Sequence, residues 1–486
     1  MKTGREKKWS ELLAAAKIPY AGPEQAVNLV TADSRKAKRG SVFVCIQGFH
    51  EDGHDHAAEA YKQGCRCFVS EKGLPLPQDA SAVLVPDTRK TLAMLCHAFF
   101  DFPAEKLSVV GITGTKGKTT TAKMLCAILT QSGIPTGCIG TNGIDYAGIH
   151  LETGNTTPDS ECLASALFDM ANRGIRAVVL EVSSQALFLD RVAGIPFFAT
   201  AFTNLSPDHI GDTEHPNFAH YRDCKRKLFS VCPSGYAVFC ADDPYAGYMQ
   251  SGCTAVCSTF GLESGDYRAE NVFPTTENGI PETSFLLTHG KESAQIKLPF
   301  AGEYNVRNAL CAAALAERFG VPLPQIASGL AHVSVPGRNE VVKTGSGVTF
   351  VIDYAHNGAS MENILKTMRK YAENELWCVV GSVGGRTEVR RKEIGKAVSL
   401  YCDRVILTSD NPDAEDPLSI CEEIKSGFAK DIPCEIIPDR EAALRFCLAN
   451  AKKGDLVVLA GKGHENYQLV HGKKLPFSEK EILKDG

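Results

Sequence analysis

A glycine-rich segment, residues 111–121, carries residue types whose spacing suits phosphate chemistry. It reads Gly-Ile-Thr-Gly-Thr-Lys-Gly-Lys-Thr-Thr-Thr and follows the apolar run Leu107–Ile112. Backbone N–H groups of such a loop, with the N-terminus of the helix that follows, can hold phosphate oxygens. The usual spacing would put the first glycine at position 112, but here it lies one residue earlier, at Gly111. We predict nucleotide binding rather than a glycine-rich turn without a ligand.

Three side chains extend this prediction to a cation. Lys118 is expected to reach the terminal phosphates, and the Thr119 hydroxyl is expected to bind Mg²⁺. Glu181 ends the apolar run Ala177–Leu180, where a hard cation held by Thr119 would accept an oxygen ligand. Taken alone, Glu181 could equally be a helix cap.

The elements that must position these residues follow an α/β pattern. Residues 1–106 indicate a small mixed domain, and residues 107–336 a central domain of parallel strands alternating with helices. Pro336–Gly337 marks a boundary, after which residues 337–486 indicate another parallel α/β domain. Ligands of open α/β sheets bind beyond the carboxyl ends of the strands, where the polar residues of this chain cluster.

Composition excludes several classes of function. The chain has 486 residues, 44% of them hydrophobic, and a formal net charge of −5, so no general basic field attracts nucleic acid. No apolar run reaches the roughly 18 residues of a membrane span, and the basic segment Met1–Trp9 leads into a polar helix rather than a signal core. We therefore expect a cytoplasmic protein without a nucleic-acid partner or membrane insertion.

The 18 cysteines lie mostly in apolar segments and show no repeated Cys-x-x-Cys spacing. We expect reduced, buried thiols rather than zinc sites or disulfides. Cys65 and Cys67 with His54 and His56 could form a metal site, but a half-buried strand explains the two cysteines more simply.

The variant loop resembles that of the Mur ligases and of folylpolyglutamate synthases, which share a three-domain fold. Asp33-Ser-Arg35, Gly40-Ser-Val-Phe-Val44 and Gly53-His-Asp55 resemble the uridine-nucleotide-binding domain of MurE-type Mur ligases, which folylpolyglutamate synthases lack. Further motifs follow in family order along the chain: Asn155-Thr-Thr-Pro158, Glu181-Val-Ser-Ser184 with Arg191, Asn204-Leu-Ser-Pro-Asp-His209, Asn305-Val-Arg-Asn308, Pro336-Gly-Arg338, Asp353-Tyr-Ala-His356, Asp410-Asn-Pro412 and Gly461-Lys-Gly-His-Glu465.

This resemblance covers essentially the whole chain and implies an activity. MurE-type ligases use ATP and Mg²⁺ to add the third amino acid to UDP-N-acetylmuramoyl-L-alanyl-D-glutamate in peptidoglycan precursor synthesis. The glutamyl carboxylate attacks the γ-phosphate, and the incoming amine displaces phosphate from the acyl phosphate. The resemblance implies a small N-terminal UDP-binding domain, a central ATP-binding domain and a Rossmann-like C-terminal domain. The expected partners are small-molecule substrates, and the expected state is a monomer.

Family motifs assign roles to individual residues. The resemblance implies Lys118, Lys225 and His209 as catalytic residues, and Thr119, Glu181, His209 and carbamylated Lys225 as metal ligands. It implies ATP-binding roles for Gly114, Thr115, Lys116, Gly117, Lys118, Thr119, Thr120, Asn308, Arg338, Asp353 and His356. It implies dipeptide-nucleotide binding by Ser34, Thr156, Thr157, Ser183 and Arg191.

Plainer interpretations exist for several of these residues. Without the resemblance, Lys225 would be a solvated lysine on an amphipathic helix. Thr156 and Ser183 could equally be caps or turn residues. At His356-Asn-Gly358 the family commonly has proline last, and glycine there changes loop stiffness rather than chemistry.

The incoming amino acid is expected at the C-terminal domain, and here the chain departs most from the family. The implied binding residues are Arg386, Asp410, Asn411, Asp413, Gly461 and Glu465. Family members that add meso-diaminopimelate usually carry arginine where this chain has Asp413. Because an aspartate repels a second carboxylate, we expect L-lysine or L-ornithine, with meso-diaminopimelate as the alternative.

Two observations weaken that expectation, and two other functions remain as alternatives. Arg390 and Arg391 could supply a replacement cation, and Gly385 and Thr387 replace acidic residues common in the family. A folylpolyglutamate synthase is disfavoured by the N-terminal motifs. If the chain were an inactive nucleotide-binding scaffold, we would expect Lys118, Lys225 or His209 to be replaced by another residue. All three are present.

Overall fold

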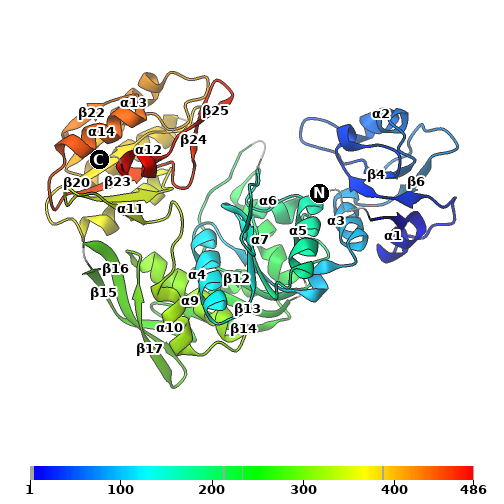
Figure 1. The fold of residues 1–486 in the computed structure, drawn as a ribbon, viewed down its shortest axis with the longest axis horizontal. Coiled ribbons are helices and arrows are strands. Elements are labelled where there is room, and N and C mark those ends of the chain that lie inside the picture. The colour runs from blue at the N-terminus through cyan, green and yellow to red at the C-terminus, as the bar shows by residue number, and fades with distance from the viewer. Residues whose placement is uncertain (1–4, 212–213, 233, 278, 386–387, 485–486) are drawn as a thin grey trace. The chain divides into compact units, whose positions relative to one another are not determined.

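The computed structural model describes residues 5–211, 214–232, 234–277, 279–385 and 388–484. The chain forms two compact units: Met1–Arg268 with Arg307–Ile326, and Ala269–Val306 with Ala327–Gly486. Both are built from helices and β-sheets, which confirms the α/β class (Figure 1). The division at residues 106 and 336 stays a prediction.

The first unit begins with a four-stranded parallel sheet in the order β3-β4-β5-β6. Its central strands are buried at every residue, because side chains pack on both faces. Cys67 begins β5 and Cys65 lies two residues before it; both are buried, and the strand is buried at every residue rather than half-buried as predicted. The elements are β1 (Lys7–Lys8), α1 (Trp9–Ala15), β2 (Ala26–Val27), β3 (Leu29–Thr31), β4 (Ser41–Val44), α2 (Ala57–Lys62), β5 (Cys67–Ser70), β6 (Ser81–Leu84) and α3 (Thr88–Phe99).

A larger sheet follows in the same unit, in the order β10-β9-β8-β11-β7-β12-β13-β14. Strands β8, β11, β7, β12, β13 and β14 are parallel, as predicted, whereas β9 and β10 are antiparallel additions. The strands are β7 (Ser108–Thr113), β8 (Thr136–Gly140), β9 (Gly143–Tyr146), β10 (Ile149–Leu151), β11 (Ala177–Glu181), β12 (Phe197–Phe202), β13 (Ser234–Cys240) and β14 (Val256–Gly261). The helices are α4 (Lys118–Gln131), α5 (Ser160–Asn172), α6 (Ser184–Phe188), α7 (Phe218–Ser230) and α8 (Ala246–Gln250).

Register brings the chemically interesting segments to one edge of this sheet. Gly111 of β7 pairs with Leu180 of β11 on one side and with Thr200 of β12 on the other. Since these strands run parallel, the segments that leave their carboxyl ends emerge together. The glycine-rich loop, the carboxylate of Glu181 and the segment after Phe202 are therefore neighbours.

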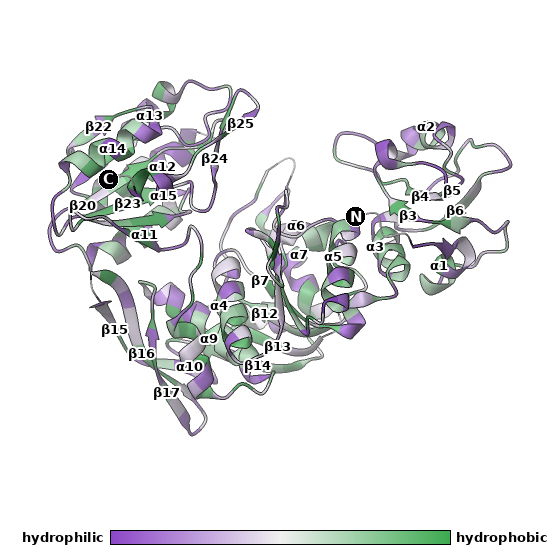
Figure 2. Ribbon diagram, in the orientation of Figure 1, coloured by the Kyte–Doolittle hydropathy of each residue, from purple (hydrophilic) through white to green (hydrophobic). Residues whose placement is uncertain are grey.

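The second unit contains a six-stranded sheet in the order β18-β19-β23-β20-β21-β22, parallel except for the edge strand β18. Alternate residues of one strand, such as Trp377 and Cys378, belong to separate hydrophobic clusters on its two faces. Figure 2 shows green, hydrophobic ribbon in β20 and β23. The elements are β18 (Glu340–Lys343), β19 (Thr349–Asp353), α11 (Gly358–Arg369), β20 (Leu376–Val380), α12 (Glu388–Tyr401), β21 (Arg404–Leu407), α13 (Pro417–Ser426), β22 (Cys434–Ile436), α14 (Arg440–Asn450), β23 (Leu456–Ala460), β24 (Tyr467–Val470), β25 (Lys473–Pro476) and α15 (Glu479–Lys484).

Antiparallel strands also precede that sheet, and the sequence did not predict them. Strand β16 (Ile280–His289) pairs with β17 (Glu292–Leu298) through a tight turn, and β15 (Tyr267–Glu277) lies next to β16. Helices α9 (Glu303–Glu317) and α10 (Leu323–Ala331) follow. Twelve of the 18 cysteines are buried and the other six are partly buried. In the part of the chain that the structure describes, no helix is both long enough and apolar enough to cross a bilayer.

Candidate functional site

The glycine-rich loop connects β7 to α4, and two of its glycines are required by its shape. Gly114 and Gly117 have φ of +152° and +85°, which side-chain-bearing residues rarely adopt. A Cβ on Gly114 would lie 1.9 Å from Oγ1 of Thr203, and one on Gly117 would lie 2.3 Å from Oδ1 of Asn308. The loop therefore packs closely against its neighbours while α4 begins at Lys118.

Residues that follow β12 hold the loop in this shape. Asn204 accepts a hydrogen bond from Thr115 N at its carbonyl (2.8 Å) and from Lys116 N at Oδ1 (3.0 Å). Asn204 Nδ2 and Thr203 Oγ1 both donate to Lys116 O, at 2.9 and 2.7 Å. Asn204 stands in a recognised motif, yet neither it nor Thr203 was predicted as a site residue. Their position after the strand next to β7 is the signal that could have identified them.

Two lysines from different elements meet at one carbonyl. Lys118 Nζ donates to Gly114 O at 2.9 Å and to Thr115 O at 3.1 Å, and Lys225 Nζ donates to Gly114 O at 2.8 Å. Lys225 is 1% exposed and lies 4.5 Å from the ring centroid of Tyr221. Burial, and after it the ammonium of Lys118, hold the pKa of Lys225 well below its usual range. Lys225 is thus not the solvated lysine that the amphipathic pattern alone would suggest.

Oxygen atoms gather at the carboxyl ends of β8 and β11. Thr119 Oγ1 donates to Glu181 Oε2 at 2.8 Å, and Thr141 contributes its N–H to Oε1 at 2.9 Å and its hydroxyl to Oε2 at 3.2 Å. Glu181 is 1% exposed. A buried carboxylate beside two hydroxyls suits a hard cation such as Mg²⁺. Thr141, which directly follows β8, was missed by the sequence analysis.

His209 lies at the rim of this region. It is a non-glycine residue with a φ of +56°, and its Nδ1 lies 3.1 Å from Oε1 of Glu214. The neighbouring Asp208 pairs with the ammonium of Lys116 at 3.0 Å. Burial acts to raise the pKa of Asp208, but Lys116 and His209 outweigh it and lower that pKa to about 2. Lys116 is therefore paired with a carboxylate within the loop region.

A cavity of about 240 Å³ opens directly onto these lysines. Lys118, Lys225 and His209 line it together with Thr156, Ser183 and Arg191. Three of the predicted substrate residues thus share one cavity with the phosphate loop. An anion inside it would meet a guanidinium and two lysines, which suits carboxylates and phosphates.

Other predicted residues of the first unit have structural partners. Thr157 is fully buried, where its hydroxyl donates to Glu181 O at 2.8 Å and its carbonyl accepts from Arg191 Nη1 at 2.9 Å. Ser183 caps α6 by accepting from Ala186 N, so the capping alternative holds although its side chain also lines the cavity. Thr120 and Asn308 lie buried beside the loop, whereas Ser34 belongs to a short 3₁₀ turn after β3.

In the second unit, Arg338, Asp353 and His356 lie around the end of β19. Asp353 accepts from Asn339 N and Ala355 N, both at 2.9 Å, and burial raises its pKa above the usual range. His356 Nδ1 donates to Tyr354 O at 2.7 Å, and the Arg338 guanidinium lies 4.6 Å from the centroid of the Tyr354 ring.

Three of the residues predicted to bind the amino acid, Asp410, Asn411 and Glu465, lie around a buried lysine that was not predicted as a site residue. Lys462 is 0% exposed and donates to Asn411 Oδ1 at 2.8 Å and to Glu465 Oε2 at 2.9 Å. Its ammonium also lies 3.6 Å from Oδ1 of Asp410. Gly461 has a φ of +106°, and a Cβ there would lie 2.7 Å from Asp410 Oδ2. These groups lie close together, with the Lys462 ammonium between them.

Asp413 has a structural role that its position in the motif did not indicate. Its φ is +54°, a conformation that aspartate and asparagine tolerate better than most residues. Its Oδ1 accepts from Gly472 N at 2.6 Å, in the turn between β24 and β25. Arg391, one of the suggested replacement cations, is 2% exposed and paired with Glu415 and Glu423 at 2.6 and 2.8 Å. Arg386 and Thr387 lie outside the described residues.

Replacing Gly117 with alanine is expected to weaken ATP binding by at least about tenfold, because the new Cβ would overlap Asn308 and move the loop. The matched control is Gly133→Ala at the other end of α4. Gly133 also has a positive φ, +76°, but a Cβ at this position would meet nothing within 4 Å. Equilibrium titration with a fluorescent ATP analogue measures both variants. If Gly117→Ala and Gly133→Ala bound ATP equally well, close packing at Gly117 would not be needed for ATP binding.

Comparison with protein families covers most of the chain. Residues 112–316 match the Mur ligase middle domain, residues 337–463 the Mur ligase glutamate ligase domain, and residues 26–100 the Mur ligase family catalytic domain. Two curated relatives are named UDP-N-acetylmuramoyl-L-alanyl-D-glutamate--2,6-diaminopimelate ligase. That of Bacillus licheniformis is 38% identical over 478 residues, 96% of each chain. That of Geobacillus kaustophilus is 38% identical over 462 residues, 93% of each chain.

Solved structures agree with this assignment. A structure of a ligase with the same name aligns with a TM-score of 0.72 at 28% identity, covering 97% of both chains. Folylpolyglutamate synthase from Mycobacterium tuberculosis aligns with a TM-score of 0.63 at 19% identity over 77% of this chain, a likeness of fold alone. With three family domains matched in order and relatives alike over nearly their whole length, the chain belongs to the Mur ligase family and is an ATP-dependent ligase of the MurE type.

Proposed function

We propose that the chain adds a diamino acid to the glutamyl carboxylate of UDP-N-acetylmuramoyl-L-alanyl-D-glutamate. The observation that carries this proposal is the shared cavity, where Lys118 of the phosphate loop faces the same space as Thr156 and Arg191. A carboxylate held by the Arg191 guanidinium would lie beside the loop that holds the phosphates of ATP. Both reactants then meet in one orientation, which removes much of the entropic barrier to phosphoryl transfer.

The residues of the cavity have separate tasks in this proposal. Lys118 balances the charge that develops on the transferring phosphoryl group while the glutamyl carboxylate attacks it. Thr119 and Glu181 would hold Mg²⁺, which supplies additional positive charge at the phosphates. His209 lies at the rim, where it can contribute a further ligand. The acyl phosphate is then attacked by the amine of the incoming amino acid, and inorganic phosphate leaves.

Carbamylation of Lys225 is part of the same proposal. Burial lowers the pKa of Lys225 well below its usual range, which favours the neutral amine, and the neutral amine is the form that reacts with CO₂. The product is a carboxylate-like group on a long stem. Lys225 lines the cavity beside Lys118, where such an anion would meet positive charge and could bind a cation.

For the amino acid, we propose 2,6-diaminopimelate, the substrate in the names of the curated relatives. The lysine expectation depended on the charge of Asp413, and the relatives do not support it. Asp413 is explained by the turn that it caps at Gly472, so its presence does not require an ammonium ligand. L-lysine remains a second candidate because Asp413 offers no cation for a distal carboxylate.

The test is phosphate release by the purified protein with ATP, Mg²⁺ and the UDP-linked dipeptide, with one amino acid offered at a time. We expect meso-diaminopimelate to give a kcat/KM at least about tenfold above those of L-lysine and L-ornithine. Turnover with L-lysine alone would overturn the choice of amino acid and leave the ligase reaction intact. No phosphate release with any of the three would overturn the reaction itself.

The variant Asp413→Asn separates the two candidates further. Asparagine keeps the positive φ and an acceptor for Gly472 N–H but removes the charge. If diaminopimelate is the substrate, its KM is expected to stay equal or fall in this variant. If the aspartate selects L-lysine by charge, the KM for L-lysine rises instead.

We place the reaction in the cytoplasm, because the UDP-linked substrate and ATP are both cytoplasmic metabolites.

A further inference from the structure

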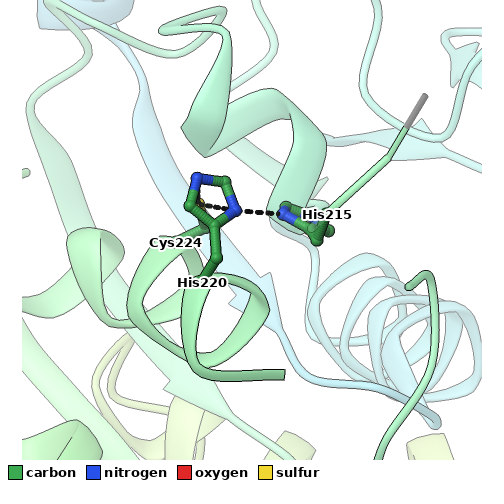
Figure 3. A group of neighbouring side chains, drawn as sticks. All are labelled: His215, His220 and Cys224. Atoms are coloured by element: carbon green, nitrogen blue, oxygen red, sulfur yellow. Dashed lines mark hydrogen bonds between the residues drawn. The ribbon is translucent and has the colours of Figure 1, made fainter. Parts of the chain in front are cut away.

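Three side chains with nitrogen and sulfur donors, His215, His220 and Cys224, lie close together (Figure 3), and the first of them also lines the cavity. His220 and Cys224 are four residues apart in α7, so they project from the same face of the helix, and His215 reaches them from the preceding segment. Their donor atoms all lie within 4.8 Å of one another. Among the described residues, no other set of three or more His, Cys, Asp or Glu residues is gathered closely enough to hold a metal ion.

The distances suit a tetrahedral ion. His215 Nδ1 lies 2.9 Å from His220 Nδ1, and Cys224 Sγ lies 3.8 Å from His220 Nδ1. Zinc with bonds of about 2.05 Å to nitrogen and about 2.3 Å to sulfur would require roughly 3.3 Å between the nitrogens and roughly 3.6 Å between nitrogen and sulfur. The two nitrogens would have to separate by a few tenths of an ångström, and Cys224 Sγ, which also lies 3.9 Å from His220 Nε2, would have to turn toward Nδ1.

Neighbouring side chains orient the rings of His215 and His220. Nε2 of His215 lies 2.9 Å from Oγ of Ser184, and in the tautomer whose Nε2 donates to that hydroxyl the Nδ1 lone pair faces His220. An outer hydrogen bond of this kind orients metal-binding histidines in general. The ring of Phe188 packs against His220 at 4.9 Å and limits its movement.

A simpler interpretation is a hydrogen-bonded pair of histidines beside a buried thiol. One hydrogen bond between the two Nδ1 atoms would satisfy both rings without any ion. That interpretation accounts for the histidine pair but gives no role to the helical spacing that places Cys224 beside His220. Soft nitrogen and sulfur donors with no oxygen ligand also differ in kind from the Thr119–Glu181 position, which suits Mg²⁺.

We propose that His215, His220 and Cys224 form a binding site for a divalent transition-metal ion of the zinc class, separate from the magnesium position. Binding exchanges the thiol proton of Cys224 for the ion, and His220 carries its remaining proton on Nε2 instead of Nδ1. The three protein ligands leave a fourth position for water. His215 lines the cavity, and Cys224 directly precedes Lys225 in α7. An ion bound here would therefore restrain the part of α7 that carries Lys225.

The experiment uses full-length protein freed of metal by a chelator, without ATP or substrate. Zn²⁺ bound after gel filtration is measured by atomic emission, and Co²⁺ is titrated as an optical probe. We expect one ion per chain, and a Co²⁺ spectrum with tetrahedral bands and a thiolate-to-cobalt charge-transfer band. His220→Asn and Cys224→Ser are each expected to weaken binding by at least about tenfold, and Cys224→Ser to abolish the charge-transfer band.

Matched controls are His150→Asn, which alters an exposed histidine paired with Asp145, and Cys232→Ser, which alters a partly buried cysteine just beyond α7. Both are expected to bind as the wild type does, and circular dichroism melting checks the fold of all four. Wild-type protein that binds no Zn²⁺ overturns the proposal. So does a Co²⁺ spectrum without the thiolate band, which is measured on the wild type even if a variant fails to fold. Equal losses in the variants and the controls would also overturn it.

Discussion

Replacing Lys118 with alanine is expected to lower the kcat/KM for ATP-dependent phosphate release by about 10²–10³-fold. The Lys118 ammonium is positioned by the carbonyls of Gly114 and Thr115, so it is fixed at the loop before substrate arrives. A preorganised cation costs no reorganisation when charge develops on the phosphoryl group, whereas water that replaces it must reorient. The measurement is a coupled phosphate-release assay at saturating UDP-linked dipeptide and amino acid, with ATP varied.

Lys123→Ala is the matched control for this variant. Lys123 lies on the same helix α4, but its ammonium pairs with Asp145 at 2.6 Å rather than with the loop. We expect its loss to change kcat/KM by less than about threefold. If Lys118→Ala bound ATP and turned over as the wild type does, the assignment of the loop to phosphate chemistry would be wrong.

Lys225→Ala is expected to reduce kcat by about 10²–10³-fold with a smaller effect on the KM for ATP. Lys225 reaches Gly114 O and lines the cavity beside Lys118, so any charge on it acts directly at the reacting groups. In the proposed carbamylated form it helps to hold a cation, which stabilises the transition state more than the bound substrates. Steady-state kinetics with each substrate varied separates kcat from KM.

The control for Lys225 is Lys227→Ala on the same helix. Lys227 Nζ lies 3.5 Å from Leu187 O and belongs to no part of the loop, so we expect near wild-type kinetics. Carbamylation itself is checked by adding ¹³C-bicarbonate and observing a carbamate carbon signal by NMR. The signal is expected in the wild type and in Lys227→Ala, and absent from Lys225→Ala. A signal that persists in Lys225→Ala would assign the modification to another lysine.

The pH dependence of that signal follows from the direction of the pKa shift. Burial lowers the pKa of Lys225, so its neutral amine is populated at lower pH than that of a solvated lysine. We therefore expect the carbamate signal to appear at lower pH than the carbamate of a free lysine in the same solution. The cause is local, because the desolvated ammonium has Lys118 as its neighbour at Gly114 O.

Several residues show why the site could be predicted in part. The loop at residues 111–121 was recognisable because strand, glycines, lysine and threonines are contiguous, and contiguous residues share one local geometry. Thr141 and Thr203 follow other strands and touch that loop or its carboxylate, and their own neighbours in sequence carry no comparable signal. Lys462 lies inside a recognised motif, but its role was missed because its partners Asn411 and Asp410 lie about fifty residues away.

The sequence by itself determined the α/β class, the phosphate loop and the family, because hydrophobic periodicity and ordered motifs are properties of a linear chain. Only the tertiary structure decided which groups the side chains of Asp413 and Lys225 contact. The Asp413 carboxylate is used in the turn at Gly472, which its motif did not reveal. Lys225 and Lys118 are over a hundred residues apart, yet parallel strand register and a helix bring both ammoniums to Gly114 O. Burial and close approach depend on packing between distant segments, and packing is what sets the charge of each group at the site.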